Sequence, residues 1–299
     1  MTVDTRIAGA QGDTEEDTVL DLWFTEELHS NWRTSVKVTD VLASAQSPYQ
    51  RIEVLQTEGH GRMLVIDGKI QACDLDEFVY HEMLTHLPLL THEAPRRVLV
   101  IGGGDGGTMR ETLRHPSVEK GILAEIDQVV IDLCQQLMPS LGAGLQESPR
   151  LEVAARDASE YIREVRDLDA ILIDSSDPEG PSERLFTVDF YRELDRALAP
   201  GGILSFQAGS PFFYQEQISR MYTDLKQVFA HVRPYLVPIP TYPSGTWCLM
   251  TASHTLDPLA VAPSELERRM QQRGISETRY YTPQTHHGSL ALPPFLKLT

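Results

Sequence analysis

The stretch RRVLVIGGGDGGTMRE, Arg96–Glu111, decides the fold of this chain. A run of apolar residues leads into a glycine-rich turn and then a helix-forming segment, an arrangement that often cradles a phosphate at the helix N-terminus. Asp105, however, stands among the glycines, and its carboxylate would repel a phosphate placed there. The sequence therefore predicts a strand–turn–helix unit whose ligand carries positive charge beside the turn.

Downstream, apolar runs continue to alternate with helix-like segments. The apolar runs cover residues 97–102, 121–126, 151–155, 169–175 and 201–207, and the helix-like segments cover residues 108–115, 129–138, 158–165 and 189–198. Strands that alternate with helices are typical of a parallel, doubly wound sheet. We therefore predict an α/β fold over residues 93–299, with a Rossmann-like, methyltransferase-type and mostly parallel sheet.

The chain has a different pattern before residue 93. Short apolar or alternating runs at 49–57, 62–68 and 69–74 are separated by Gly and Asp, which indicates the hairpins of a small antiparallel β domain. A segment with helical spacing follows at 77–90. We assign residues 19–92 to this N-terminal β domain with its linking helix, and the polar residues 1–18 to a disordered acidic tail.

The composition excludes several classes of protein. With 26 Lys and Arg against 43 Asp and Glu, the formal net charge of −17 argues against a basic face for nucleic acid. No apolar run is long enough to cross a bilayer, and the N-terminus resembles neither a secretory signal nor a transit peptide. We therefore expect a cytoplasmic protein without nucleic-acid or membrane partners. The acidic surplus favours either solubility or a cationic substrate.

Metal binding is not expected from the sequence. Cys73, Cys134 and Cys248 lie far apart and form no CxxC pattern, so we expect reduced, buried thiols. His81 and His86 are five residues apart, whereas a zinc-binding helix of the metalloprotease type places its histidines four apart on one face.

Carboxylates follow the first four strands of the predicted sheet. They are Asp105, Glu125, Asp157, Asp174 and Asp177. A single acid after a strand usually caps a helix or forms a turn, and Asp157 fits the capping role. Five acids at neighbouring strand ends, where open α/β sheets bind their ligands, instead favour a cationic ligand that offsets their repulsion.

The glycine spacing is compatible with a nucleoside. Gly102, Gly104 and Gly107 satisfy GxGxxG, and Glu125 follows about twenty residues later, where an acid that binds ribose is expected. Because Asp105 argues against phosphates, we expect an S-adenosyl compound, whose sulfonium replaces the phosphate. The carboxylate of S-adenosylmethionine would be repelled by these acids, whereas the bare ammonium of decarboxylated S-adenosylmethionine would be attracted. The charge pattern therefore favours the decarboxylated form.

Several segments resemble the polyamine aminopropyltransferases, and most closely the spermidine synthases. In chain order they are YQRIEV (49–54), GRMLVIDGKIQACDLDEFVYHEMLTHLPLL (61–90), VLVIGGGDGG (98–107), AEID (124–127), IDSSDPEGPSERLFTVDFY (173–191), IPTYPSG (239–245) and RYYTPQTHHGSLALPPFL (279–296). The resemblance implies an N-terminal β domain and a Rossmann-like catalytic domain. It also implies transfer of an aminopropyl group from decarboxylated S-adenosylmethionine to a diamine, usually giving spermidine and 5′-methylthioadenosine.

The resemblance also implies a role for each matching residue. Asp174 would be the catalytic base, Asp177 its neighbour in the substrate channel, and Tyr80 would help to orient the amine. Asp105 would bind the aminopropyl ammonium, Glu125 the ribose, and Asp157 with Ala158 the adenine. The remaining pocket residues would be Gln50, Gln71, His81, Pro181, Gln207 and Tyr242. No cofactor or metal is expected, because decarboxylated S-adenosylmethionine is a co-substrate and its leaving thioether is stable.

The sequence leaves the acceptor open. Gly209 stands two residues after Gln207, where eukaryotic members usually place a Glu, and Ala158 replaces the glycine of many members. Putrescine is favoured, and cadaverine, agmatine or spermidine (leading to thermospermine) are alternatives. An S-adenosylmethionine-dependent amine N-methyltransferase and a non-catalytic polyamine or nucleoside sensor are the competing hypotheses. The resemblance further suggests a homodimer or homotetramer, built partly through the N-terminal β domain.

Overall fold

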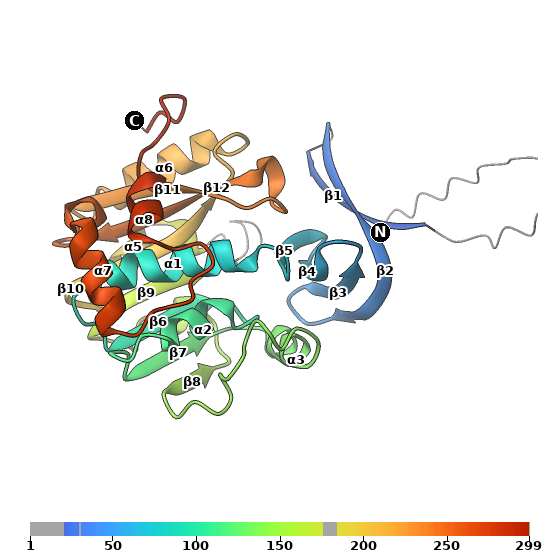
Figure 1. The fold of residues 1–299 in the computed structure, drawn as a ribbon, viewed down its shortest axis with the longest axis horizontal. Coiled ribbons are helices and arrows are strands. Elements are labelled where there is room, and N and C mark those ends of the chain that lie inside the picture. The colour runs from blue at the N-terminus through green and yellow to red at the C-terminus, as the bar shows by residue number, and fades with distance from the viewer. Residues whose placement is uncertain (1–20, 30, 176–183, 299) are drawn as a thin grey trace, which may run out of the picture. The chain divides into compact units, whose positions relative to one another are not determined.

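The N-terminal part of the chain is an antiparallel sheet (Figure 1). The computed structural model describes residues 21–29, 31–175 and 184–298, so the predicted tail 1–18 and the site candidates Asp177 and Pro181 lie outside it. The five strands pair in chain order: β1 (Leu22–His29), β2 (Trp32–Gln46), β3 (Arg51–Thr57), β4 (Gly61–Ile66) and β5 (Lys69–Cys73). The predicted antiparallel β domain is therefore confirmed. β1 and β2 were not foreseen as strands, because exposed polar residues interrupt their apolar ones.

The hairpin between β4 and β5 illustrates how the sequence sets this sheet. Asp67 and Gly68 form its two-residue turn, and both have positive φ, 48° and 78°. Asp-Gly is a preferred pair for this turn, whose twist matches that of the flanking strands. The Asp67 carboxylate also accepts the backbone N–H of Arg51 at 2.8 Å, which fixes the turn against β3.

The larger sheet is mostly parallel, as predicted. Its strands are β6 (Arg97–Gly102), β7 (Lys120–Ala124), β8 (Leu151–Ala154), β9 (Leu168–Asp174), β10 (Leu198–Gly209), β11 (His231–Pro238) and β12 (Thr246–Ser253), in the spatial order β11-β12-β10-β9-β6-β7-β8 (Figure 1). β12 runs antiparallel to both of its neighbours, β10 and β11. The chain runs from β6 outward to β8 and then returns to β9 on the other side of β6. This reversal is the topological switch point beside which such sheets bind ligands.

Helices cover both faces of this sheet. They are α1 (Glu77–Thr91), α2 (Gly107–Leu113), α3 (Gln128–Leu137), α4 (Ala158–Tyr161), α5 (Val188–Ala197), α6 (Gln215–Leu225), α7 (Pro263–Gln272) and α8 (Pro283–Ser289). Along β6, Leu99 and Ile101 pack in the cluster that contains α5 and α6, whereas Val98 and Val100 pack with α1 and α2. Alternate residues of one strand thus supply two cores, which explains why the run reads as continuously apolar.

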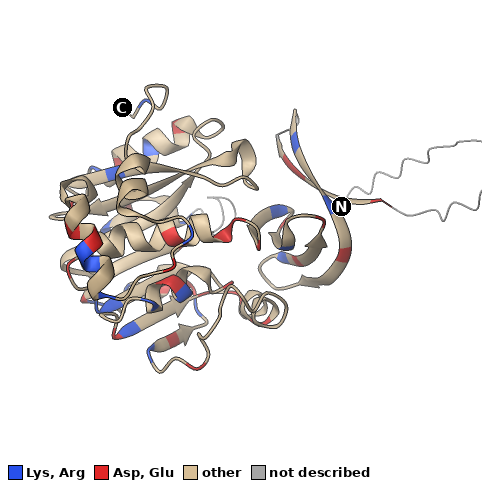
Figure 2. Ribbon diagram, in the orientation of Figure 1, with Lys and Arg blue, Asp and Glu red and all other residues tan. Residues whose placement is uncertain are grey.

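Three further details concern the helices. The segment predicted at 158–165 forms only the four-residue α4. Among the described residues, no helix is long and apolar enough to cross a membrane. Figure 2 shows acidic and basic residues side by side along α7, where Glu265 pairs with Arg268 and Arg269. Such pairs one turn apart are typical of a solvated helix face.

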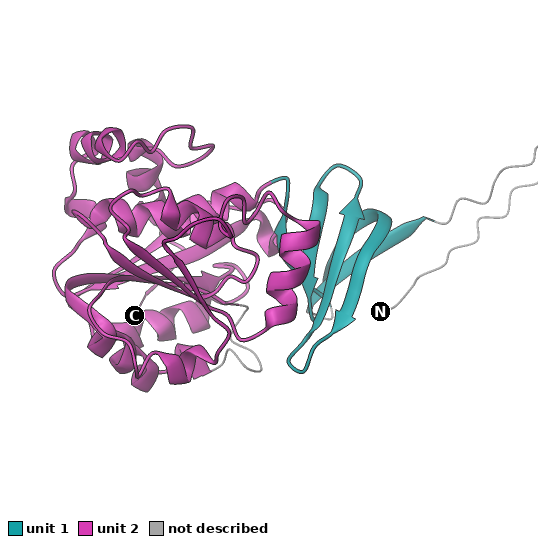
Figure 3. Ribbon diagram, turned by 90° about the horizontal axis from the view of Figure 1, so that it is seen from below, with its two compact units in different colours: residues 1–75 teal, residues 76–299 magenta. Residues whose placement is uncertain are grey.

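The chain divides into two compact units, residues 1–75 and 76–299 (Figure 3). The division lies before α1, whereas the sequence suggested a boundary at residue 93. The physical reason is burial: every α1 residue from Val79 to Thr91 is buried, and the helix packs against α2, β9, β10 and β11. The helix therefore belongs to the second unit and delivers its side chains to that unit's site.

Candidate active site

Asp174 lies at the switch point, at the end of β9. It is the register partner of Gly102 at the end of β6. A Cβ on Gly103 would lie 2.7 Å from Asp174 Oδ2, so the glycine at this position leaves room for the carboxylate. The glycine-rich turn thus accommodates an acid from another strand as well as carrying one of its own.

Two hydroxyl groups hold the Asp174 carboxylate. Tyr80 Oη of α1 donates to Oδ1 at 2.9 Å, and Thr108 Oγ1 of α2 donates to Oδ2 at 2.6 Å. Burial and the nearby charge of Asp105 raise the pKa of Asp174, against the opposing effects of His81 and the two hydroxyls. A carboxylate with a raised pKa is a better proton acceptor, as a general base requires.

Asp105 has the opposite electrostatic character. Its Oδ1 accepts the backbone N–H of Gly107 at 2.8 Å, and its Oδ2 lies 3.5 Å from His81 Nε2. Burial opposes ionisation of Asp105, but the charge of His81 and the hydrogen bonds outweigh it and lower its pKa. Neighbouring acids whose pKa values move apart usually divide the roles of anchor and base. Asp105 fits the permanent anion and Asp174 the proton acceptor.

His81 lies between two carboxylates. Its Nδ1 is 2.6 Å from Glu77 Oε2, one turn earlier in α1, and its Nε2 faces Asp105. Burial would lower the pKa of His81, but Asp105 and Glu77 raise it to about 10. Ligand atoms of His81, Asp105 and Asp174 lie within 4.8 Å of one another, as in a metal site. Because both ring nitrogens face carboxylates as donors, we interpret the group as an ion-pair cluster.

Glu125 lies at the other side of the glycine turn, directly after β7. Its carboxylate accepts the backbone N–H groups of Asp127 at 2.8 Å and Gly104 at 3.2 Å. Burial raises its pKa to about 7, although the two backbone hydrogen bonds oppose that rise. The structure thus brings Glu125 to the glycine turn, as the sequence predicted. Its binding of ribose remains a prediction.

Asp157 caps α4. Its Oδ1 accepts the backbone N–H of Ser159 at 2.8 Å, and Ala158 is buried as the first helical residue. The capping role suggested by the sequence is therefore confirmed, and the adenine-binding role of Asp157 and Ala158 remains a prediction.

The part of the site near Tyr80 is formed by one amide side chain and two aromatic side chains. Gln207 Nε2 donates to the Ser175 carbonyl at 3.3 Å, and Trp247 Nε1 donates to Gln207 Oε1 at 3.1 Å. The Tyr242 ring lies 6.0 Å from that of Tyr80 and 4.8 Å from that of Trp247. Aromatic faces and amide groups of this kind suit an organic ammonium ion.

Four residues of this site were missed by the sequence analysis: Glu77, Thr108, Arg110 and Trp247. The spacing of Glu77 from His81 and of Arg110 from Asp105 indicates that these residues can meet. However, a charged residue at a helix surface is usually only solvated. Thr108 and Trp247 carried no such signal, because their partners are far away in the sequence.

Two predicted pocket residues lie in the first unit. Gln50 precedes β3, and Gln71 lies in β5, where its Nε2 donates to the Lys69 carbonyl at 3.3 Å. Asp174 belongs to the other unit, and a role for Gln50 and Gln71 in the site remains a prediction.

Sequence comparison identifies relatives over most of the chain. The Spermine/spermidine synthase domain matches residues 77–260, and the Spermidine synthase tetramerisation domain matches residues 22–74. A polyamine aminopropyltransferase of Desulforudis audaxviator is 44% identical over 276 residues, which cover 92% of this chain and 98% of the relative. Another, from Bacillus cereus, is 41% identical over 278 residues, 93% of this chain and 98% of the relative.

Solved structures agree with this result. A spermidine synthase in complex with the transition-state analogue AdoDATO has a TM-score of 0.87 and 35% identity, with 96% of each chain covered. The spermidine synthase of Thermotoga maritima has a TM-score of 0.85 and 36% identity, with 92% of each chain covered. The similarity therefore extends through both units.

Proposed function

Because this chain belongs to the spermine/spermidine synthase family, and is therefore an aminopropyltransferase, we propose that it makes spermidine from putrescine. Decarboxylated S-adenosylmethionine would supply the aminopropyl group and leave as 5′-methylthioadenosine. The observation that carries this proposal is the pair Asp105 and Asp174, adjacent at the switch point with pKa values displaced in opposite directions. A cytoplasmic location, a homodimeric or homotetrameric assembly and the absence of a cofactor belong to the same proposal.

The chemistry needs a neutral amine as nucleophile. About one part in a thousand of an amine with a pKa near 10.4 is neutral at pH 7, a deficit of roughly 4 kcal/mol. As the new C–N bond forms and the C–S bond breaks, the sulfonium becomes a neutral thioether and the nitrogen releases a proton. Asp174 is placed to accept that proton, and the Tyr80 hydroxyl fixes the carboxylate. No electron transfer or further electrophile is needed for this displacement.

Charge also favours the decarboxylated donor. Asp105 would pair with the aminopropyl ammonium, while Glu125 would accept hydrogen bonds from the ribose hydroxyls. S-adenosylmethionine would bring its own carboxylate toward Asp105 and Asp174 and would be repelled. The same acids would attract a diamine, whose second ammonium must be anchored for the first to attack in line.

An acceptor panel tests the proposal. Purified protein is given decarboxylated S-adenosylmethionine or S-adenosylmethionine, each with putrescine, cadaverine, agmatine or spermidine, and the products are resolved by mass. We expect aminopropyl transfer with the decarboxylated donor, fastest to putrescine. Faster transfer to another amine would show that this amine, and not putrescine, is the preferred acceptor. Methyl transfer from S-adenosylmethionine as the main reaction would refute the proposed function, and a protein that binds amines without turnover would be a sensor.

A further inference from the structure

A buried histidine lies between two carboxylates inside a site that we expect to bind cations. His81 is 2% exposed and has Glu77 on one side and Asp105 on the other, at 2.6 Å and 3.5 Å from its two ring nitrogens. A neutral imidazole has one N–H donor and one lone pair, so one of these carboxylates would then face a lone pair. Only the imidazolium can donate to both.

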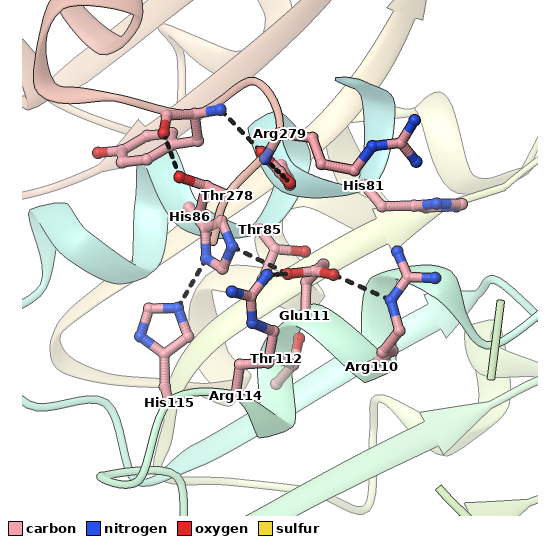
Figure 4. Close-up of polar contacts among 12 residues, drawn as sticks. His81, Thr85, His86, Arg110, Glu111, Thr112, Arg114, His115, Thr278 and Arg279 are labelled. Carbon is pink, nitrogen blue, oxygen red and sulfur yellow. Dashed lines mark hydrogen bonds and ion pairs between the residues drawn. The ribbon is translucent and has the colours of Figure 1, made fainter. Parts of the chain in front are cut away.

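Glu77 is held firmly in its position. Its Oε2 accepts from Arg110 Nη2 at 2.9 Å as well as facing His81 Nδ1. Arg110 is itself anchored, because its Nε donates to Glu111 at 2.9 Å and its Nη1 donates to the carbonyls of Ser140 and Leu141. Figure 4 shows His81, Arg110 and Glu111 between α1 and α2. The carboxylate that faces His81 is therefore fixed before any substrate binds.

The ring of His81 has no room to turn away. It packs against the first residue of α2, where a Cβ on Gly107 would lie 2.2 Å from His81 Cε1. The Tyr80 ring contacts it edge-on at 5.4 Å between centroids. The orientation of the imidazole is thus set by the fold.

We propose that Glu77, fixed by Arg110, is a positioning residue that holds His81 as a permanent imidazolium, and that this charge helps the acceptor amine to lose its proton. A site lined only by carboxylates would bind the diamine well but would stabilise its ammonium form, which cannot attack. An imidazolium beside Asp105 and Asp174 opposes that effect, because a nearby like charge favours the neutral amine. This inference rests on the proposed function, since the amine is the nucleophile of that reaction.

The charged and titratable groups around His81 are consistent with this role. They are Glu77 and Tyr80 of α1, Asp105 of the glycine turn, Arg110 of α2 acting through Glu77, and Asp174 of β9. The pKa of His81 is raised to about 10 by the two carboxylates that face it, despite its burial. The imidazolium thus persists at neutral pH.

The first experiment measures the charge directly. The histidine ring carbons are isotopically labelled, and their NMR signals are followed from about pH 6 to about pH 10. The signal of His81 is assigned from its absence in the His81→Gln variant. We expect the wild-type signal to stay at the imidazolium position up to at least about pH 9, far above an ordinary histidine. In Glu77→Gln its midpoint should fall by about one pH unit or more. Glu77→Asp, which keeps the carboxylate, should recover part of that loss.

The second experiment measures the consequence for the reaction. The pH dependence of kcat is compared between wild type, Glu77→Gln, His81→Gln and the double variant. We expect the rise of kcat with pH to move up by about one pH unit in His81→Gln, because the bound amine deprotonates less easily without the imidazolium. In Glu77→Gln a shift should appear only above the pH at which His81 loses its proton in that variant. KM of His81→Gln for the amine should stay equal or fall, since a cation has been removed from the site. The double variant should shift no further than His81→Gln, because both changes remove the same charge.

Glu265→Gln is the matched control. Glu265 makes the same kind of helical ion pair, with Arg269 on α7, outside the site. It should leave both the His81 titration and the kcat profile unchanged. A wild-type His81 that titrates near pH 6.5 would overturn the inference without any variant. So would Glu77 variants that lose stability or activity evenly at all pH values.

The two proposals fail in different ways. If the wild type transfers no aminopropyl group to any amine, the proposed function fails, and the NMR titration still decides whether Glu77 sets the charge of His81. If transfer occurs but His81→Gln leaves the kcat profile in place, only the role of the imidazolium is refuted.

Discussion

Thr108 Oγ1 donates to Asp174 Oδ2 at 2.6 Å, so the first turn of α2 is hydrogen-bonded to the acid that ends β9. These residues are 66 positions apart in the chain. Their contact joins the glycine-rich turn to the strand that carries the proposed base. The site is therefore built from the meeting of β6 and β9 at the switch point, and each part of it can be tested separately.

Asp174→Asn should lower kcat by about 10²–10⁴-fold, the usual contribution of a positioned general base. Donor binding should change less, because Asp105 and Glu125 are untouched. The remaining rate should rise from about pH 7 to about pH 10, as more amine becomes neutral in solution. Steady-state kinetics over this range measure both effects. Asp169→Asn, on the same strand, is the control, and a defect confined to KM would make Asp174 an anchor instead of the base.

Asp105→Asn should reduce the preference for the decarboxylated donor. The wild type should bind decarboxylated S-adenosylmethionine much more tightly than S-adenosylmethionine, because the Asp105 carboxylate attracts an ammonium and repels a carboxylate. The variant should narrow this gap, mainly by losing affinity for the decarboxylated form. Calorimetry with both compounds measures it. Equal affinities in the wild type would contradict the proposed electrostatic selection.

Glu125→Gln should weaken binding of 5′-methylthioadenosine, since each lost charge-assisted hydrogen bond contributes roughly 1.5–3 kcal/mol. Burial raises the pKa of Glu125 to about 7 in the free protein, so the carboxylate form that accepts from ribose decreases below that pH. Wild-type affinity should therefore fall on acidification through pH 7. Affinity of the variant should stay flat in the same titration. A pH-independent wild type would indicate that Glu125 is only structural.

Glu125 also affects stability in the absence of ligand. Because its folded-state pKa lies above its ordinary value, stability is fully present at low pH and is lost as the pH rises through about 7. Glu125→Gln should remove this loss. Denaturant unfolding without ligand at pH 5 and pH 8 tests this prediction. An equal change in the free energy of unfolding between these pH values in the two proteins would contradict it.

Gly107→Ala should damage the site by displacing His81. Gly107 has no positive φ, so alanine fits the backbone, but its Cβ would lie 2.2 Å from His81 Cε1. Overpacking of this kind typically costs about 1–3 kcal/mol of stability, and we expect a loss of kcat together with it. Gly288→Ala in α8 is the control, because nothing lies within 4 Å of its added Cβ. Full activity in Gly107→Ala would show that the His81 position is not critical.

A pair of buried histidines predicts how stability depends on pH. Arg273 Nη1 lies 3.2 Å from His115 Nδ1, which must accept because a guanidinium only donates. His115 Nε2–H then donates to His86 Nδ1, and His86 Nε2–H donates to Glu111, each at 3.0 Å (Figure 4). A proton added to Nδ1 of His115 would face the N–H donor of Arg273, and neither group could then accept a hydrogen bond. The chain of hydrogen bonds therefore requires a neutral His115.

Burial, together with the charge of Arg273, holds the pKa of His115 well below its ordinary value. Its contribution to stability is therefore present above about pH 6.5 and is lost as the pH falls further, at about 1.4 kcal/mol per pH unit. Denaturant unfolding at pH 7.5 and pH 5.5 should show a smaller acid loss for His115→Gln than for wild type. His254→Gln, at an exposed histidine, should behave as wild type. An equal acid loss in His115→Gln would contradict this prediction.

Much of the fold follows from local sequence patterns. The runs of β6 and β9 are apolar throughout because both faces of a parallel sheet are covered. The glycine-rich turn indicates where α2 begins. The strand-end acids Asp105, Glu125 and Asp174 were found for the same reason, since the carboxyl ends of parallel strands meet at one edge. The outer strands β1 and β2 were missed because their exposed residues blur the alternation.

The sequence by itself determined the alternation of strands and helices from β6 to β10 and the acids at the strand ends, and it led to the prediction of a cationic ligand. Each of these depends on residues that are neighbours in the chain. Only the tertiary structure decided that α1 belongs to the second unit, that Tyr80 and Thr108 hold Asp174, and that His81 lies between two carboxylates. Tyr80 and Asp174 are 94 residues apart, and Asp105 and Glu77 together raise the pKa of His81. Contacts across such separations, and the burial that shifts a pKa, arise only when the packed segments meet.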